Sequence, residues 1–126
     1  MVIVTENQLD PGKLFGMLRK ENTGSAIFHY AVVKDKAGEK QTSGILFERN
    51  GDMESELKEI ETDIRNYRDI DDILLVRRIG SLQVGDLISL VAVSSQASID
   101  AFEACQYGLA RIRKMSSLKK TELYSD

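Results

Sequence analysis

The most constraining feature of this chain is an apolar run at residues 87–93, which stands between a glycine-containing turn and a helical pattern. Both alternating faces of the run are apolar, which is typical of a strand covered on both sides. Gly80 and Gly85 punctuate the preceding turn, where glycine supplies backbone angles that other residues avoid. Ser94 or Ser95 can cap the helix that follows. The pattern predicts a buried strand that leads into a helix N-terminus, a place where anions bind.

The composition indicates one globular domain spanning residues 1–126. Of the 126 residues, 42% are hydrophobic and 29% are charged, which is enough to bury a core. No apolar run approaches the roughly 20 residues that cross a bilayer, and the N-terminal residues do not resemble a signal peptide. One cysteine excludes an internal disulfide, so a cytoplasmic location is expected. The net charge of −3 gives no reason to expect nucleic acid as a partner.

Hydrophobic periodicity predicts an α+β fold. Helices are expected where apolar residues recur every three or four positions, and strands where they alternate or run continuously. The predicted strands are 2–4, 24–33, 45–48, 73–76 and 87–93, and the predicted helices are 9–21, 52–67 and 98–113. Helices set around hairpin-connected strands are typical of the α+β class.

The last predicted helix has an apolar stripe that should face the core. It consists of Ile99, Phe102, Cys105, Leu109 and Ile112. Cys105 is therefore expected to be a buried, inert thiol rather than a nucleophile.

Few other residues indicate chemistry. His29 is the only histidine and has no cysteine or carboxylate at metal-ligand spacing, so a packed or hydrogen-bonded histidine is expected and no metal site. Four glutamates of the helix at 52–67 are expected to form a solvated face; they are Glu54, Glu56, Glu59 and Glu61.

The charge near the C-terminus is uneven. Five cations and no acid lie between Glu103 and Glu122; the cations are Arg111, Arg113, Lys114, Lys119 and Lys120. These cations could complement the negative dipole end of a helix, or they could form a pocket for an anionic ligand. The residues alone favour the first interpretation.

One segment resembles a known family. Residues 78–86 read Arg-Ile-Gly-Ser-Leu-Gln-Val-Gly-Asp, and after the apolar strand residues 101–105 read Ala-Phe-Glu-Ala-Cys. This arrangement resembles the large, catalytic (MoaE-type) subunit of molybdopterin synthase, densely over residues 78–107 and collinearly over 24–122. The resemblance implies a MoaE-like α/β-hammerhead fold, with a mostly antiparallel sheet and flanking helices.

The resemblance also implies a reaction and its partners. In the family, a central homodimer binds a ubiquitin-like small subunit whose C-terminal Gly-Gly carries a thiocarboxylate. Sulfur passes from that tail to cyclic pyranopterin monophosphate in two rounds, and the product is molybdopterin. No covalently bound cofactor is implied. The resemblance favours the anion-pocket interpretation of the C-terminal cations.

Catalytic positions can be carried over from the family's two lysines, which stand seven residues apart. Counting from Ala-Phe-Glu-Ala-Cys, the first falls on Arg113 and the second on Lys120. Thr121 takes the place of a basic neighbour, and Glu122 matches the family's glutamate. Arg113 keeps the charge but is effectively never deprotonated, whereas Lys120 is retained.

Substrate-binding positions diverge more. The family's strand-end arginine falls on Lys34, preceded by Val32 and Val33. A His-Arg pair, which the second subunit contributes to the pocket, is replaced by Ala97 and Ser98. Substrate contacts are expected from these five residues together with Thr121 and Glu122.

Three functions remain open from the sequence. The chain is a divergent synthase subunit that uses Lys120, or a non-catalytic relative that binds a pterin, a nucleotide or a small protein. A structural dimer whose basic segment has no ligand is the third.

Overall fold

The fold is known from a computed structural model that describes residues 1–38 and 40–124. It contains three helices, α1 (Pro11–Met17), α2 (Met53–Tyr67) and α3 (Ser98–Ile112). The strands are β1 (Val2–Thr5), β2 (Ser25–Val32), β3 (Lys36–Ala37), β4 (Lys40–Arg49), β5 (Asp72–Arg78), β6 (Gly80–Gln83), β7 (Leu87–Ser95) and β8 (Leu118–Tyr124). The predicted α+β class is confirmed.

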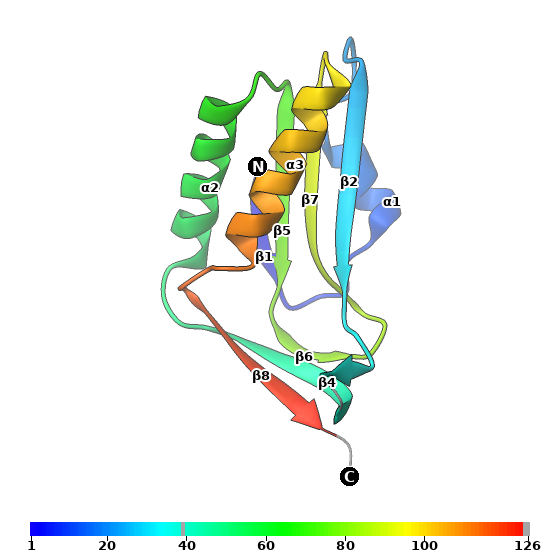
Figure 1. Ribbon diagram of the computed structural model, residues 1–126, viewed down its shortest axis with the longest axis vertical. Helices are drawn as coiled ribbons and strands as arrows, with labels where there is room; N and C mark the ends of the chain where they lie inside the picture. Colours follow the sequence, from blue (N-terminus) through cyan, green and yellow to red (C-terminus); the bar gives the residue numbers. More distant parts are fainter. Residues whose placement is uncertain (39, 125–126) are drawn as a thin grey trace.

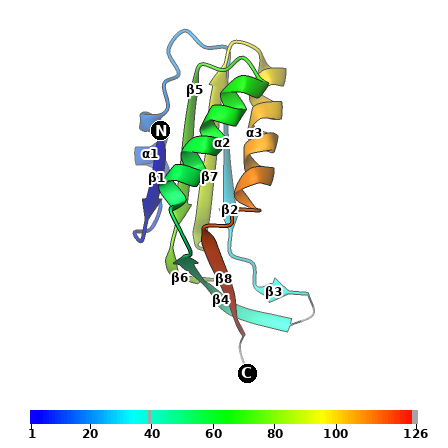
Figure 2. The ribbon, with the colours of Figure 1, turned by 90° about the vertical axis from the view of Figure 1, so that its left-hand side faces the viewer.

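The strands form two sheets. The first has the order β1-β5-β7-β2, in which the β1–β5 pair is parallel and the other pairs are antiparallel. In the second sheet β4 pairs with β3, β6 and β8, all antiparallel. The second sheet lies beyond the end of the first, past the C-terminal end of α3 (Figures 1 and 2). The mostly antiparallel arrangement expected from the resemblance is therefore present.

Helices cover both faces of the first sheet, as the apolar run predicts. On one face α2 and α3 lie side by side, and α1 lies on the other (Figures 1 and 2). Val91 and Val93 of β7 belong to the core under α2 and α3, whereas Leu90 and Ala92 belong to the core under α1. These alternating residues are fully buried, so β7 has no solvent-facing side.

Helix α3 packs through small residues, which corrects the predicted stripe. Cys105 and Ile112 are buried, but Ile99 and Phe102 are 60% and 59% exposed. The inner face is instead made of small side chains and a glycine, namely Ala101, Ala104 and Gly108. A Cβ on Gly108 would lie only 2.9 Å from Ile64 Cδ1, so the glycine lets α2 and α3 approach closely.

Two boundaries differ from the prediction. The first helix ends at Met17, because Leu18 turns into an extended conformation and buries its side chain in the core. Neither Ser94 nor Ser95 caps α3. Their hydroxyls donate to the carbonyls of Arg19 (2.8 Å) and Asp69 (2.7 Å), and Ala97 stands at the N-cap without a side-chain hydrogen bond.

Lys119 and Lys120 of the basic C-terminal segment lie on a strand, whereas Arg111 and Arg113 lie at the C-terminal end of α3. Met115–Ser117 leave α3, and β8 then pairs along β4 from Arg49↔Leu118 to Thr42↔Tyr124. Glu56 of α2 holds the turn before β8, because its carboxylate accepts hydrogen bonds from the backbone N–H of Ser116 (3.0 Å) and Ser117 (2.9 Å). This glutamate is therefore more than part of a solvated face.

Candidate functional site

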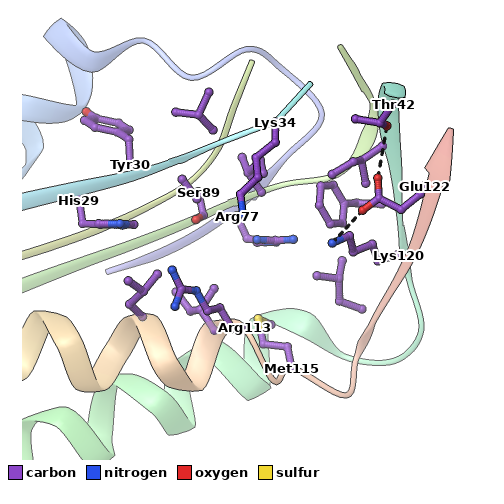
Figure 3. A pocket seen from close by; sticks show the side chains of 18 of the residues that line it. His29, Tyr30, Lys34, Thr42, Arg77, Ser89, Arg113, Met115, Lys120 and Glu122 are labelled. Carbon is purple, nitrogen blue, oxygen red and sulfur yellow. Dashed lines mark hydrogen bonds and ion pairs between the residues drawn. The ribbon is translucent and has the colours of Figure 1, made fainter. Parts of the chain in front are cut away.

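A cavity of about 890 Å³ opens where the two sheets and the end of α3 meet (Figure 3). Its walls come from β2, the segment that follows it, β4, β5, β7, the C-terminal end of α3 and β8. These elements are far apart in the sequence, so the cavity exists only in the folded chain. A space of this size is large enough for a small-molecule ligand.

The cavity is strongly cationic. Among its described lining residues there are five lysines and arginines and one acid, Glu122; the cations are Lys34, Lys36, Arg77, Arg113 and Lys120. Like charges gathered around a cavity attract an anionic ligand. The pocket interpretation of the C-terminal cations is thus favoured by the position of Arg113 and Lys120, while Arg111 pairs with Asp63 away from the cavity.

Lys120 is held in place by a short polar chain. Its Nζ lies 3.1 Å from Glu122 Oε1, and Thr42 Oγ1 lies 3.3 Å from Glu122 Oε2 (Figure 3). The Thr42 hydroxyl also lies 2.8 Å from the carbonyl oxygen of Leu123. Residues 120 and 122 share one face of β8 because side chains alternate along a strand. The strand therefore presents both groups to the cavity.

Arg77 is a buried cation in the wall of the same cavity. It is only 7% exposed, and its guanidinium lies 4.3 Å from the ring centroid of Phe47. Burial lowers the pKa of Arg77 to about 10, because the charged form loses its hydration. Within the described chain its Nε meets no hydrogen-bond acceptor.

Two further polar groups of the cavity wall are also buried without a hydrogen-bond partner in the described chain. Ser89 Oγ and His29 Nδ1 are buried and have no hydrogen-bond partner in the described chain. Ser89 lies directly opposite both Arg77 and Ala31 in the sheet, and His29 is two residues before Ala31 on the same face. Unpaired buried polar groups are uncommon in folded proteins and call for an explanation.

The structure brings together part of the predicted site. Lys120, Arg113, Lys34, Val32 and Glu122 all line the cavity. Val33 is buried beside it, in the small core under β4 and β6. Thr121 is exposed on β8 and is not among the lining residues. Ala97 and Ser98 lie at the N-terminal end of α3, the opposite end from Arg113, so in one chain they do not reach this cavity.

Sequence reasoning missed Arg77, Ser89 and His29 as pocket residues. Arg77 directly follows an apolar strand, and Ser89 interrupts an apolar run. Polar residues inside strands that are buried on both faces were the available signal, because such residues need partners. His29 was expected to be packed or hydrogen-bonded; its Nδ1 is buried, and within the described chain that atom has no hydrogen-bond partner.

Neither a metal cluster nor a membrane span is found in the part of the chain described. No group of three or more histidine, cysteine, aspartate or glutamate residues is arranged there to hold a metal ion. No described helix is long and apolar enough to cross a membrane.

Comparison with known families gives the same relationship as the motif at residues 78–105. A family model described as "MoaE protein" matches residues 4–115. The chain belongs to the MoaE family. The molybdopterin synthase catalytic subunit of Pyrococcus abyssi is 27% identical to this MoaE-family chain over 108 residues, which are 85% of this chain and 73% of that protein.

Solved structures share the fold. Molybdopterin synthase from Staphylococcus aureus superimposes with a TM-score of 0.89 at 25% identity, over 98% of this chain and 90% of that one. A complex of subunits 1 and 2 of molybdopterin-converting factor from Helicobacter pylori contains a chain with a TM-score of 0.73 at 13% identity, over 99% of this chain and 90% of that one. The second likeness concerns the fold alone.

The segment that carries the family resemblance has a structural role in this MoaE-family chain. Arg78 Nη1 lies 3.3 Å from Asp86 Oδ2, and the same oxygen accepts a hydrogen bond from the backbone N–H of Gln83 at 2.9 Å. Gly80 and Gly85 have φ angles of 100° and 91°, which other residues rarely adopt. The motif thus closes the turn between β6 and β7. β6 connects β5 and β7 of the first sheet and itself pairs with β4 of the second.

Proposed function

We propose that this chain acts in molybdenum cofactor biosynthesis as the large subunit of a molybdopterin synthase. Its substrate is cyclic pyranopterin monophosphate, and sulfur comes from the C-terminal thiocarboxylate of a ubiquitin-like small subunit. In each of two rounds a carbon–oxygen bond of the substrate is exchanged for a carbon–sulfur bond, and water releases the small subunit's tail as a carboxylate. The product is molybdopterin. The reaction is assigned to the cytoplasm.

The observation that carries this proposal is the cationic cavity on a MoaE fold. Substrate and sulfur donor are both anions, and the cavity is lined by five cations against one acid among its described residues. Fixed charges in a partly enclosed site stabilise developing negative charge better than water does, because they are already oriented. The cavity therefore suits a reaction that passes through anionic intermediates.

Within this proposal Lys120 and Arg113 have different roles. Lys120 is the group that can transfer a proton or form a covalent bond, and Glu122 orients it at 3.1 Å. Arg113 holds negative charge and does not exchange a proton, because a guanidinium is effectively always protonated. Lys34 adds a third charge to the cavity wall from the segment after β2.

A homodimer is part of the proposal. Ile99 and Phe102 are 60% and 59% exposed on the first turns of α3, next to Ala97 and Ser98. Exposed bulky apolar side chains of this kind are typical of an interface. In a twofold dimer this end of α3 can approach the partner's cavity, and Ala97 and Ser98 would then contribute backbone and a hydroxyl where the family has a cationic pair.

A small protein partner is the remaining element. The Helicobacter pylori protein with the same fold is described in a complex of the two subunits of molybdopterin-converting factor. Val32, one of the residues that line the cavity, is 48% exposed. An apolar residue at the rim fits the passage of an extended Gly-Gly tail, because glycine lacks a side chain that would need room.

The second candidate function is a non-catalytic relative that binds a pterin, a nucleotide or a small protein. The observation that favours it is Arg113, which replaces a lysine of the family with a group that cannot exchange a proton.

A reconstituted reaction separates the two functions. The purified chain is mixed with a thiocarboxylated small subunit and cyclic pyranopterin monophosphate, and dithiolene formation is followed. Product formation supports the synthase. If the substrate binds but no dithiolene forms, the binding relative is the correct function.

A further inference from the structure

We infer that Arg77, Ser89 and His29 form an oxyanion subsite in the sheet wall of the cavity, and that it takes a phosphate group. The carrier of that phosphate, the pterin substrate, rests on the proposed function. The subsite itself does not, because it follows from the buried polar groups alone.

The geometry of the sheet places the three side chains on one face. Arg77 and Ser89 are paired directly across β5 and β7, and Ser89 is paired with Ala31 of β2. His29 lies two positions before Ala31, so its side chain leaves the same face of the sheet. In Figure 3 the His29 ring, the Ser89 hydroxyl and the Arg113 guanidinium surround the same space, with Arg77 beside it.

Each of the three side chains has a buried polar atom without a hydrogen-bond partner in the described chain. Arg77 Nε, Ser89 Oγ and His29 Nδ1 are buried, and within residues 1–38 and 40–124 none of them has a hydrogen-bond partner. Arg77 and Ser89 are 7% and 1% exposed. Leaving a buried polar or charged group without a hydrogen bond is costly. Three such groups at one cavity wall therefore indicate a ligand that forms hydrogen bonds with them.

The charges around the three groups favour an anion as their partner. Glu122, the acid among the described lining residues, already contacts Lys120 Nζ (3.1 Å) and Thr42 Oγ1 (3.3 Å). The guanidinium carbon of Arg77 lies 4.3 Å from the centroid of the Phe47 ring, a contact that occupies no N–H group, and Nε has no hydrogen-bond acceptor within the described chain. A guanidinium, a hydroxyl and an imidazole nitrogen together match an anion with several acceptor oxygens, and phosphate is the common biological example.

The positions that correspond to the family's His-Arg pair cannot supply a cation for a phosphate in this chain. Ala97 and Ser98 provide no cation, and in one chain they lie at the far end of α3. Arg77 supplies a cation from within the chain, on the sheet rather than across a dimer interface. The phosphate would therefore lie against β5 and β7, deeper than the Lys120–Glu122 pair on β8.

The test is phosphate binding by the full chain at constant ionic strength. Inorganic phosphate is titrated calorimetrically into the wild type, Arg77→Met, Ser89→Ala and the control Lys119→Met, which removes one exposed cation outside the lining. We expect Arg77→Met to weaken binding by roughly 10- to 100-fold, because a charge-assisted hydrogen bond is lost. Ser89→Ala should weaken binding severalfold, and Lys119→Met should stay within about twofold of the wild type.

Thermal unfolding of the same proteins provides a second readout. Arg77→Met removes a buried charge whose Nε has no hydrogen-bond partner within the described chain, so in phosphate-free buffer it should melt at the same temperature as the wild type or higher. Phosphate should raise the melting temperature of the wild type clearly more than that of Arg77→Met, because the variant binds phosphate more weakly. If Arg77→Met does not fold, the phosphate affinity of Ser89→Ala decides.

The outcomes separate this inference from the proposed function. Absence of phosphate binding by the wild type, or equal binding by Arg77→Met, contradicts the subsite. Arg77-dependent phosphate binding without dithiolene formation leaves the subsite standing and removes the synthase. If Arg77→Met forms dithiolene with an unchanged KM for the pterin, the synthase function stands and the phosphate subsite is contradicted.

Discussion

Lys120 Nζ lies 3.1 Å from Glu122 Oε1, and both side chains leave β8 on the side of the cavity. Lys119 and Thr121 alternate with them and are exposed outside the lining. The alternation of a strand therefore decides which of two adjacent lysines can act on a ligand. In a helix, Lys119 and Lys120 would be about 100° apart around the axis and would not point to opposite faces.

Replacing Glu122 with glutamine should lower kcat strongly and change the free energy of unfolding only slightly. Glutamine keeps an acceptor for the Thr42 hydroxyl but loses the charge that orients Lys120. A misdirected catalytic group costs about 10- to 100-fold in rate, whereas a half-exposed ion pair contributes about 0–1 kcal/mol to folding. Steady-state kinetics and urea unfolding measure the two effects. A kcat equal to that of the wild type would show that Glu122 does not position Lys120.

Stability should depend on pH through Glu56. Burial alone would raise its pKa, but hydrogen bonds from Ser117 and Ser116 outweigh that effect and hold the pKa below the ordinary value of 4.5. Because the folded pKa is depressed, this contribution is complete above pH 4.5 and is lost as the pH falls through the folded pKa. Glu56→Gln should cost about 1 kcal/mol at pH 7, and the cost should shrink as the pH falls below 4.5 toward the depressed folded pKa.

Urea unfolding at several pH values tests this prediction. Glu59→Gln is the matched control, because Glu59 is exposed on the same helix. A constant difference between the wild type and Glu56→Gln from pH 7 to pH 3 would contradict the proposed hydrogen bonds to the 116–117 turn.

Cys105 should be unreactive in the native protein. The thiol is 6% exposed on the inner face of α3, and burial raises its pKa to about 11. It stays protonated at neutral pH, so a thiol reagent should label the folded protein far more slowly than the unfolded protein. Cys105→Ser should cost roughly 1–3 kcal/mol because it buries a hydroxyl, and Cys105→Ala should cost less. Labelling of the native protein at the unfolded rate would overturn this assignment.

Phe102→Asp should convert the proposed homodimer into a monomer. Phe102 is 59% exposed, so the substitution should leave the fold of one chain intact while it places a charge in the interface. Val84→Asp is the control, because Val84 is 42% exposed in the turn between β6 and β7. Sedimentation equilibrium measures the mass. A wild-type monomer at high micromolar concentration would contradict the dimer.

The sequence predicted correctly those helices and strands whose hydrophobic pattern lies within one short stretch of the chain. The apolar stripe of α2, with Met53, Leu57, Ile60 and Ile64 all buried, is one case, and the doubly covered β7 is another. Both depend on residues close together in the sequence. The outward direction of Ile99 and Phe102 was not predictable in this way, because two stripes on α3 satisfy the same spacing and the small-residue stripe packs closer to the sheet.

The rest of the site depends on contacts between distant segments. β8 is a strand because it pairs with β4, whose residues lie 69 to 82 positions earlier in the chain. The sequence Lys119-Lys120-Thr121-Glu122 has no apolar alternation that would predict a strand. Arg77 becomes a pocket residue only when Phe47 of β4 lies against its guanidinium. The family resemblance led to Lys120, Arg113 and Lys34. The buried polar groups of Arg77, Ser89 and His29 were recognised only in the folded structure.

The most direct test of the central claim compares dithiolene formation by the wild type, Lys120→Ala and Lys119→Ala. Each is combined with a thiocarboxylated small subunit and cyclic pyranopterin monophosphate, after circular dichroism and sedimentation have shown that fold and dimer are unchanged. We predict turnover by the wild type, loss of turnover in Lys120→Ala to below about 1%, and a rate within severalfold of the wild type in Lys119→Ala. No product from the wild type, or equal turnover by Lys120→Ala, would contradict the account.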